Sequence, residues 1–340
     1  MPEPPLRRRA LPERLAEEQR LSPLATRSSE SRGRRVPEPD DGVRTPFERD
    51  RDRILHSKAF RRLKHKTQVF INPEGDHYVT RLTHALQVTQ IARAIAASVA
   101  LNEPLTEAIA LGHDVGHTPF GHTGEDALDE HLDGGWHHAA QGVRIFEVLE
   151  GANLTWEVRD GIRAHTWKVE PGPSTPEGEV VRYADRIAYL SHDALDAMRA
   201  GAVAAADFPR SAHDALGVPG RAWIDRMIRG VVERSLEVGR VEMEPDLLEV
   251  MHELREFMFE RVYRSPAVEA RKRAAMQVVR ELVEYLTAHP GELEDSYRDP
   301  DADLVTQVVD YVAGMTDRYA LRLHDRWFRP VLFEEPGRAL

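Results

Sequence analysis

The stretch Thr80–Leu101 reads TRLTHALQVTQIARAIAASVAL, and its apolar residues recur every three or four positions. This spacing is typical of an α-helix with one buried face, because about 3.6 residues complete a turn. His84, Val88, Ile91 and Ile95 share that face. We therefore predict a core helix that carries a histidine among aliphatic side chains.

The same spacing continues through nearly every segment to about residue 328, and the alternation typical of strands is hard to find. We predict an all-α fold, a helical bundle with additional C-terminal helices. Helices are expected near residues 104–114 and 181–195, and further helices are expected at 137–150, 155–166, 221–238, 246–262, 267–288 and 301–326.

Composition divides the chain into three parts. Residues 1–43 are rich in Pro, Arg, Glu and Ser, and we expect them to form a disordered N-terminal tail. A cluster of Pro, Asp and Gly at 201–220 is typical of a boundary between domains. We therefore expect a catalytic domain at 44–210 and a C-terminal helical region at 211–340 that packs on it.

The composition excludes several classes of site. The chain has 340 residues, of which 41% are hydrophobic, enough for one large core or two joined ones. It has no cysteine, so any metal must be held by imidazole and carboxylate groups. No stretch approaches the roughly eighteen apolar residues of a membrane span, and the N-terminus lacks the apolar run of a signal peptide. We expect a cytoplasmic protein with no membrane partner.

The net charge of -11 argues weakly against nonspecific binding of nucleic acid by the whole surface. The segment from Arg44 to Lys66 differs in charge, because it contains nine Lys or Arg residues and only three acidic ones. This segment could face a nucleotide phosphate chain, although a solvated helix face explains any one of these residues equally well. Binding of nucleic acid therefore stays open.

Imidazole and carboxylate groups on predicted buried faces are the main chemical signal. Pro104 can open a helix that ends near His113 and Asp114, and Asp185 shares a face with apolar residues of a later helix. A buried carboxylate is costly unless it is paired or bound to a cation. With His84, these residues would supply two imidazoles and two carboxylates and leave positions for water and a substrate oxygen.

The alternative is purely structural, with His84 as a hydrogen-bonded core histidine and Asp185 ion-paired with Arg186. Each residue taken singly fits that alternative better, but the group together favours a metal centre. The stretch His113-Asp-Val-Gly-His-Thr-Pro-Phe-Gly-His-Thr-Gly-Glu125 packs three histidines and two acids into thirteen residues. Few purely structural segments have this composition.

These residues resemble the HD superfamily of metal phosphohydrolases, and within it the deoxyguanosine triphosphate triphosphohydrolase-like proteins. The superfamily pattern of His, His-Asp and Asp is matched in order by His84, His113, Asp114 and Asp185. The closer resemblance covers about residues 42–325 and includes the stretches Arg44-Thr-Pro-Phe-Glu-Arg-Asp-Arg-Asp-Arg-Ile54, Ala59-Phe-Arg-Arg-Leu63, Lys66-Thr-Gln68, Thr80-Arg-Leu-Thr-His84 and Gly314-Met-Thr-Asp317.

The resemblance implies hydrolysis of a deoxynucleoside triphosphate, dGTP or several dNTPs, to deoxynucleoside and tripolyphosphate by attack at the α-phosphorus. It implies a divalent metal held by the four matched residues, Mn²⁺ or Mg²⁺ ahead of Fe²⁺, Co²⁺, Ni²⁺ and Zn²⁺. It assigns catalysis to His122, as the proton donor to the leaving 5′ oxygen, with help from Glu125. The structural alternative is a helix capped by Thr123 with Glu125 as an ordinary residue of its first turn.

The resemblance also implies a substrate pocket. His117 and His138 match positions that contact phosphates, although His137 and Ala139 differ from the flanking residues expected there. Arg81 matches a position near the base or the triphosphate. Gln68, Tyr189 and Asp193 match a sugar pocket in which the tyrosine leaves no room for a 2′ hydroxyl. For Tyr189 alone, core packing with a solvated hydroxyl is the alternative.

Two other functions remain open. The same metal centre could serve an HD-type 5′-nucleotidase or another nucleotide phosphodiesterase, because metal chemistry alone does not choose the substrate. A nucleotide-sensing protein with a weak active site is the other alternative. The cationic segment and the flanking motifs favour a triphosphate substrate. The resemblance further implies a homo-oligomer, with a hexamer as one option, and a nucleotide effector at a second site.

Overall fold

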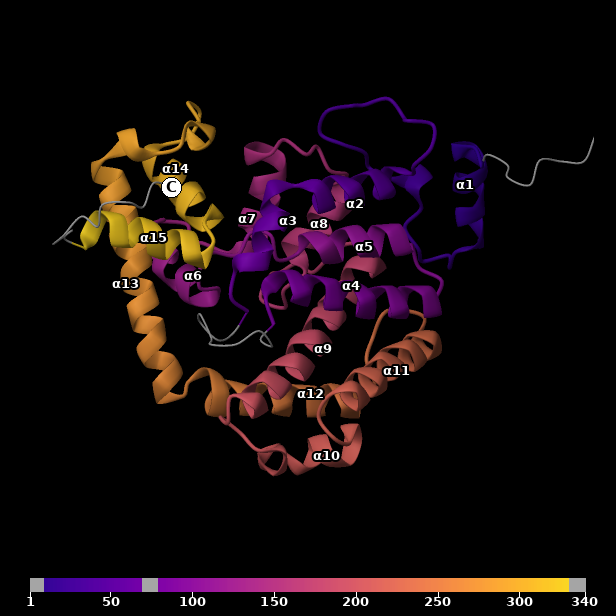
Figure 1. Cartoon of the computed structure of the whole chain (residues 1–340). Coiled ribbons are helices and arrows are strands. Elements are labelled where there is room, and N and C mark those ends of the chain that lie inside the picture. The colour runs from indigo at the N-terminus through magenta and orange to yellow at the C-terminus, as the bar shows by residue number, and fades with distance from the viewer. Residues whose placement is uncertain (1–8, 69–78, 330–340) are drawn as a thin grey trace, which may run out of the picture.

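The chain is helical almost throughout in the computed structural model, which describes residues 9–68 and 79–329 (Figure 1). The predicted all-α fold is confirmed, because these residues contain isolated bridges from Arg34 to Thr155 and from Thr67 to Thr80 but no strand. None of the helices in this described part is long and apolar enough to cross a membrane. The α-helices are α1 Leu11–Glu17, α2 Pro46–His56, α3 Lys58–Arg62, α4 Arg81–Ser98, α5 Glu103–Gly112, α6 His122–Asp129, α7 His138–Arg144, α8 Trp156–Ala164, α9 Pro176–Arg199, α10 Arg210–Leu216, α11 Arg221–Val238, α12 Pro245–Met258, α13 Pro266–Ala288, α14 Leu304–Gly314 and α15 Asp317–Phe328.

Short turns of other helical types complete the secondary structure. Two π turns follow directly on α7 and α12, at Ile145–Leu149 and Phe259–Tyr263. The 3-10 turns are Glu18–Arg20, Ser28–Glu30, Leu63–His65, Ala205–Asp207, Pro290–Glu292 and Asp295–Tyr297.

The first of two apolar cores lies in the bundle around α4, near the centre of Figure 1. α4 packs against both α5 and α9, and α5 packs against α2. The Thr80 side chain caps α4 by accepting the Thr83 N–H, and Val88, Ile91 and Ile95 are buried as their spacing predicts. Burial of each such side chain contributes about 1.5–3 kcal/mol.

A second core joins α6 to α13, α14 and α15, on the left of Figure 1. Phe120 and Leu128 belong to the same apolar cluster as Val279 from α13. The first core extends to Val262, so the two cores do not divide at the predicted boundary near residue 210. The segment between His113 and α6 therefore leads from one core to the other.

Residues 9–43 pack on the bundle, so the prediction of a disordered tail is wrong for this part of it. The Thr26 N–H and hydroxyl donate to the buried Glu177 carboxylate at 3.0 and 2.8 Å. Arg34 forms a buried ion pair with Asp50. Composition misled because the charged side chains of this segment find partners on the bundle instead of building a core of their own. Residues 1–8 lie outside the described residues.

The single helix predicted at 301–326 is two helices. α14 ends at Gly314, and the Thr316 side chain caps α15 by accepting the Tyr319 N–H at 3.3 Å. The break matters for the site, because it places Asp317 at the first position of α15, where it contacts the segment that precedes α6.

Candidate metal centre

Three helices bring the four predicted metal ligands together. His84 lies in the first turn of α4, Asp185 lies within α9, and His113 is the residue that follows α5, with Asp114 next. His84 Nε2 is 3.0 Å from Asp185 Oδ1, and His113 Nε2 is 3.4 Å from Asp114 Oδ1 and 3.8 Å from Asp185 Oδ1. The four side chains, called the ligand quartet below, thus converge as the resemblance implies.

The donor atoms of the ligand quartet suit a divalent cation. His113 Nδ1 lies 2.7 Å from the Ala110 carbonyl, so the ring donates its proton there and turns an unprotonated Nε2 toward the carboxylates. That Nε2 is buried and has no hydrogen-bond partner among the described residues. An orphaned imidazole lone pair beside two carboxylates is a donor set for divalent metals, and the backbone bond at Nδ1 is the usual way to orient such a ring.

Both carboxylates of the ligand quartet are held in the ionised form. Burial opposes ionisation of Asp114, but the neighbouring histidines and Arg81 outweigh it and hold the pKa of Asp114 well below its usual range. Arg81 Nη1 donates to Asp114 Oδ2 at 2.8 Å. For Asp185, burial is again outweighed by the His84 hydrogen bond and the nearby His113, which lower its pKa. Both carboxylates are therefore ionised at neutral pH.

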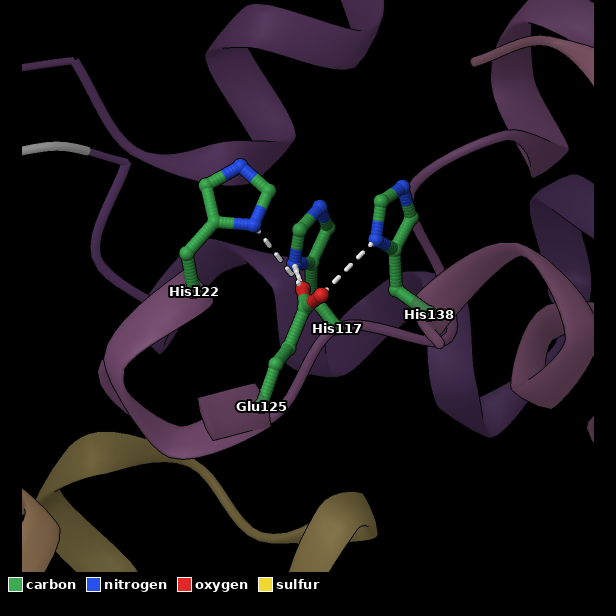
Figure 2. Close-up of side chains that lie close together, drawn as sticks. All are labelled: His117, His122, Glu125 and His138. Atoms are coloured by element: carbon green, nitrogen blue, oxygen red, sulfur yellow. Dashed lines mark hydrogen bonds and ion pairs between the residues drawn. The ribbon is translucent and has the colours of Figure 1, made fainter. Parts of the chain in front are cut away.

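Glu125 lies among three histidines, as Figure 2 shows. Its Oε1 faces Nδ1 of His117 and, at 3.3 Å, Nδ1 of His122, whereas its Oε2 lies 3.1 Å from Nδ1 of His138. The His122 side chain is 70% exposed, while those of His117, His138 and Glu125 are buried. His122 is thus the member of this group, the Glu125 cluster, that a substrate can reach.

His117 joins the Glu125 cluster to the ligand quartet. Its Nε2 lies 3.0 Å from Asp114 Oδ1, and its Nδ1 contacts Glu125. Burial lowers the pKa of His117 to about 3 and the pKa of His138 to about 4, so both rings are neutral at pH 7. A neutral His117 has one N–H and can donate to only one of its two carboxylate neighbours at a time.

The segment before His122 is tied to the C-terminal helices. Phe120 and Gly121 have φ values of 63° and 60°, a left-handed conformation that strains a bulky residue such as phenylalanine. Asp317 Oδ1 accepts the Phe120 N–H at 2.9 Å, and Asp317 Oδ2 accepts the Thr67 N–H at 3.0 Å. A buried carboxylate of α15 therefore helps to hold the turn that presents His122.

Lys66 also connects the segment before His122 to the C-terminal helices. It is buried, and its Nζ donates to the carbonyls of His117 and Ala313, the latter at 2.9 Å. Burial lowers the pKa of Lys66 to about 7. Lys66 and Asp317 both lie in motifs that carry the resemblance, but sequence reasoning gave neither a role, because partners so far away along the chain leave no local signal.

Two residues predicted for a sugar pocket follow Asp185 along α9. Tyr189 and Asp193 follow at intervals of four residues, and Tyr189 is half-buried. Asp193 accepts a hydrogen bond from the Tyr263 hydroxyl at 2.6 Å, and burial raises the pKa of Asp193 to about 7. Sequence reasoning missed Tyr263, which the π turn after α12 carries to this place. Gln68 is partly buried, and its Oε1 has no hydrogen-bond partner among the described residues.

His165 is the other residue that sequence reasoning missed. It follows α8, is buried, and lies with its ring centroid 5.0 Å from that of His113. Its Nε2 is 3.2 Å from Nε2 of His138. A usable signal was present, because His165, like His113, directly follows a helix with a buried apolar face.

Three arginines of the cationic segment from Arg44 to Lys66 form ion pairs with acidic side chains. Arg44 pairs with Asp52, and both Arg49 and Arg53 pair with Glu38. These three arginines therefore have structural partners, and Arg49, whose side chain is 12% exposed, does not lie on a solvated face.

The comparisons with known proteins agree with this geometry. Residues 81–190, which contain the whole ligand quartet, match the HD domain, and residues 241–326 match the phosphohydrolase-associated domain. A deoxyguanosinetriphosphate triphosphohydrolase-like protein from Caldanaerobacter subterraneus subsp. tengcongensis is 48% identical over 317 residues, covering 91% of this chain and 93% of that protein. A protein of the same name from Desulfatibacillum aliphaticivorans is 45% identical over 333 residues, covering 91% and 95%.

A solved structure shows the same fold at low identity. The crystal structure of a phosphohydrolase from Bacteroides thetaiotaomicron aligns with a TM-score of 0.51 and 18% identity, covering 82% of this chain and 70% of that one. HD domains bind divalent metals, and the His, Asp and Glu groups described above could hold one. The chain is 48% identical to the Caldanaerobacter protein over nine-tenths of its own length. It therefore belongs to the HD-domain phosphohydrolases, in the family of deoxyguanosinetriphosphate triphosphohydrolase-like proteins.

Proposed function

We propose that the protein hydrolyses a deoxynucleoside triphosphate, dGTP or several dNTPs, to the deoxynucleoside and tripolyphosphate. The observation that carries this proposal is the exposed His122, which contacts Glu125 and lies near the ligand quartet. Its ring centroid is 5.0 Å from that of His117, which in turn contacts Asp114. The names of the relatives that match nearly the whole chain support the choice of substrate.

The ligand quartet and the Glu125 cluster have separate tasks in this proposal. A divalent cation held by His84, His113, Asp114 and Asp185 would lower the pKa of a bound water and neutralise charge on the α-phosphate. His122 uses Nδ1 to face Glu125, which leaves Nε2 to donate a proton to the departing 5′ oxygen. The ionised Glu125 carboxylate favours the positively charged imidazole from which that proton comes.

In this proposal Arg81 and His117 contact the phosphates. The Arg81 guanidinium lies between Asp114 and the turn at Gly121, since a Cβ added to Gly121 would lie 2.7 Å from Arg81 Nη2. Glycine at this position therefore leaves room for the guanidinium beside the catalytic turn. A positive charge there stabilises the charge that develops on the phosphate chain during cleavage.

The sugar would lie along α9. Tyr189 crowds the 2′ position, and Asp193, one of whose oxygens is held by Tyr263, uses the other oxygen to accept the 3′ hydroxyl. Gln68, whose buried amide oxygen has no hydrogen-bond partner among the described residues, would complete this pocket. We also propose a cytoplasmic location and, as the resemblance implies, Mn²⁺ or Mg²⁺ as the metal, a homo-oligomer and a nucleotide effector.

Product analysis tests the proposal. The protein is loaded with Mn²⁺, incubated with each dNTP and with GTP, and the products are separated by ion exchange. We expect deoxynucleoside and tripolyphosphate in equal amounts, and dGTP turnover at least about tenfold faster than GTP turnover. Release of pyrophosphate or orthophosphate would refute the reaction, and equal turnover of GTP would refute the role of Tyr189.

A further inference from the structure

Trp167 packs on the helix that carries Asp185. It lies in the segment between α8 and α9, and its indole N–H donates to the Arg182 carbonyl at 3.1 Å. The guanidinium carbon of Arg186 lies 4.0 Å from the centre of the Trp167 ring. The face of an indole attracts a guanidinium at this distance, and the two planar groups can stack. Trp167 therefore fixes the direction in which the Arg186 side chain points.

Arg186 depends on this contact, because its charge has little other compensation. Its side chain is buried, and its Nε has no hydrogen-bond partner among the described residues. No carboxylate of residues 9–68 and 79–329 lies within ion-pair distance of it. Arg182, one turn earlier on α9, differs because its Nη1 donates to Glu179 at 3.0 Å. A buried guanidinium is costly when nothing offsets its charge, so the Trp167 ring is an important partner of Arg186.

Arg186 connects Trp167 to Tyr189. The two residues Arg186 and Tyr189 are three positions apart on α9, so their side chains are neighbours on the helix surface. The Arg186 guanidinium lies within hydrogen-bonding reach of the Tyr189 hydroxyl. Arg255 reaches the same hydroxyl from α12. A series of contacts thus runs from the Trp167 ring through Arg186 to the hydroxyl of Tyr189.

We propose that Trp167 positions Tyr189 through Arg186 and so helps the sugar pocket to reject a 2′ hydroxyl. The inference rests on the proposed function, in which Tyr189 crowds the 2′ position of the sugar. A side chain rejects a ligand by steric conflict only if it cannot move aside. Trp167 is thus a positioning residue that acts on the choice between deoxynucleotide and ribonucleotide through two other side chains.

The alternative is that Trp167 serves only the packing of the first core. Its ring centroid lies 5.2 Å from that of Tyr183, with the two planes at 87°, which is a favourable edge-to-face contact. In that role, loss of the indole would weaken the fold but would affect deoxynucleotides and ribonucleotides alike. The two roles therefore differ in selectivity and in the state of Tyr189, both of which can be measured.

The state of Tyr189 is measured first, without nucleotide. The full chain is produced with 3-fluorotyrosine in place of its eight tyrosines, and the ¹⁹F resonance of Tyr189 is the one absent from Tyr189→Phe. We expect this resonance to shift and broaden in Trp167→Leu, because the hydroxyl loses a fixed partner. Trp167→Phe, whose ring can still stack on the guanidinium, should keep it close to the wild-type resonance. An unchanged resonance in Trp167→Leu overturns the inference.

Selectivity is measured next, as the ratio of the dissociation constants for GTP and dGTP. Calorimetry on the chelator-treated full chain gives both constants without hydrolysis. In Trp167→Leu this ratio should fall roughly two- to thirtyfold, which is the range that a cation–π contact covers, mainly because GTP binds more tightly. An equal change in the two constants would assign Trp167 a purely structural role and overturn the inference.

Trp156 provides a matched control. It is partly buried, as Trp167 is, and the guanidinium carbon of Arg32 lies 3.8 Å from the centre of its ring. This pair joins the start of α8 to the N-terminal segment and includes no residue of α9. Trp156→Leu should leave the Tyr189 resonance and the selectivity ratio unchanged. A loss of selectivity as large as in Trp167→Leu would show a general effect of removing a stacked indole and would overturn the inference.

A double-mutant cycle tests whether Trp167 acts through Arg186. Arg186→Lys keeps the charge but lacks the planar group that stacks on an indole. The double variant should therefore lose no more selectivity than Arg186→Lys alone, whereas losses that add in full would overturn the inference. If Trp167→Leu does not fold, Arg186→Lys decides the question, because the Tyr189 resonance must change in it as well.

The outcomes separate this inference from the proposed function. Equal binding of GTP and dGTP by the wild type, with a Tyr189 resonance that still responds to Trp167→Leu, would refute the proposed sugar pocket and leave Trp167 as the residue that positions Tyr189. Preference for dGTP in the wild type, with the same resonance and the same ratio in Trp167→Leu, would leave the proposed function intact and overturn the inference.

Discussion

The ligand quartet and the Glu125 cluster lie next to each other but are positioned by different parts of the fold. The quartet is carried by α4, α5 and α9, three helices of the first core that pack against one another. The Glu125 cluster depends on a turn with a strained Phe120 and on the short helix α6, whose apolar side chains belong to the second core. Asp317, from α15, bonds directly to that turn.

This difference separates two properties of the site. Metal binding depends on the first core, whereas the position of the proton donor depends on contacts between the two cores. Changes in the quartet should therefore remove both metal and activity, and changes around the Glu125 cluster should remove activity alone.

The largest effect is expected for Asp185→Ala. Removal of this carboxylate leaves a buried cation short of one ligand and one negative charge, so most bound metal and all detectable turnover should be lost. Metal analysis after gel filtration, together with product release, measures both losses. A variant that retains a full complement of metal would show that Asp185 is not a ligand.

His122→Ala should keep metal and nucleotide binding while turnover falls by roughly two to four orders of magnitude, the usual contribution of general acid catalysis. Glu125→Gln should fall between the wild type and His122→Ala, because the amide keeps a hydrogen bond to the imidazole but lacks the charge that favours its protonated form. Loss of metal from His122→Ala, or near-normal turnover in it, would contradict the division between the two groups.

A smaller effect is expected for Asp317→Asn, which touches neither group. The amide can accept only one of the two backbone N–H bonds that the carboxylate accepts, and a lost charge-assisted bond costs about 1.5–3 kcal/mol. We expect kcat to fall roughly tenfold with metal content unchanged. Asp303→Asn is the matched control, because Asp303 caps α14 in the same core without contacting the turn. An unchanged kcat in Asp317→Asn would mean that the turn keeps its conformation without the full set of Asp317 hydrogen bonds.

The smallest effect concerns the pH dependence of stability in chelator-treated protein. Burial lowers the pKa of His165 to about 4, whereas an unfolded histidine titrates near 6.5. Between these values the unfolded state binds more protons, so the stability associated with neutral His165 is complete above about pH 6.5 and is lost as the pH falls toward 4.

Urea unfolding at several pH values measures this loss. His165→Gln should reduce the slope of unfolding free energy against pH by up to about 1.4 kcal/mol per pH unit between pH 6.5 and 4. His117, whose pKa is also lowered, remains in both proteins and cancels in the comparison. His138 contacts His165 at 3.2 Å and its own pKa depends on that neighbour, so the change in slope reports on the pair. Equal slopes would show that His165 does not titrate differently in the folded state.

Sequence spacing predicted most of the first core and the convergence of the quartet, for a physical reason. His84 and Asp185 each share a helical face with aliphatic side chains, and burial of that face leaves no other direction for the polar group. The metal role of these residues remains a proposal, but their placement followed from helical periodicity alone.

Features that depend on distant contacts could not be predicted in this way. Asp317 meets Phe120 across about 200 residues, and Tyr263 reaches Asp193 only because a π turn follows α12. The packing of residues 9–43 also escaped prediction, since it relies on single charged and polar pairs such as Thr26 with Glu177. Such isolated pairs leave no periodic pattern in the sequence from which they could be predicted.

The buried Lys66 side chain limits which parts of this protein can be exchanged with those of a relative. Its Nζ donates to two carbonyls, that of His117 next to the catalytic turn and that of Ala313 in α14. A chimaera that joined this HD domain to the phosphohydrolase-associated domain of a distant relative would have to supply a backbone oxygen facing Lys66 and an acid in place of Asp317. The two matched regions are therefore expected to evolve as a pair, and exchange of one without the other should disable proton transfer before it disturbs the fold.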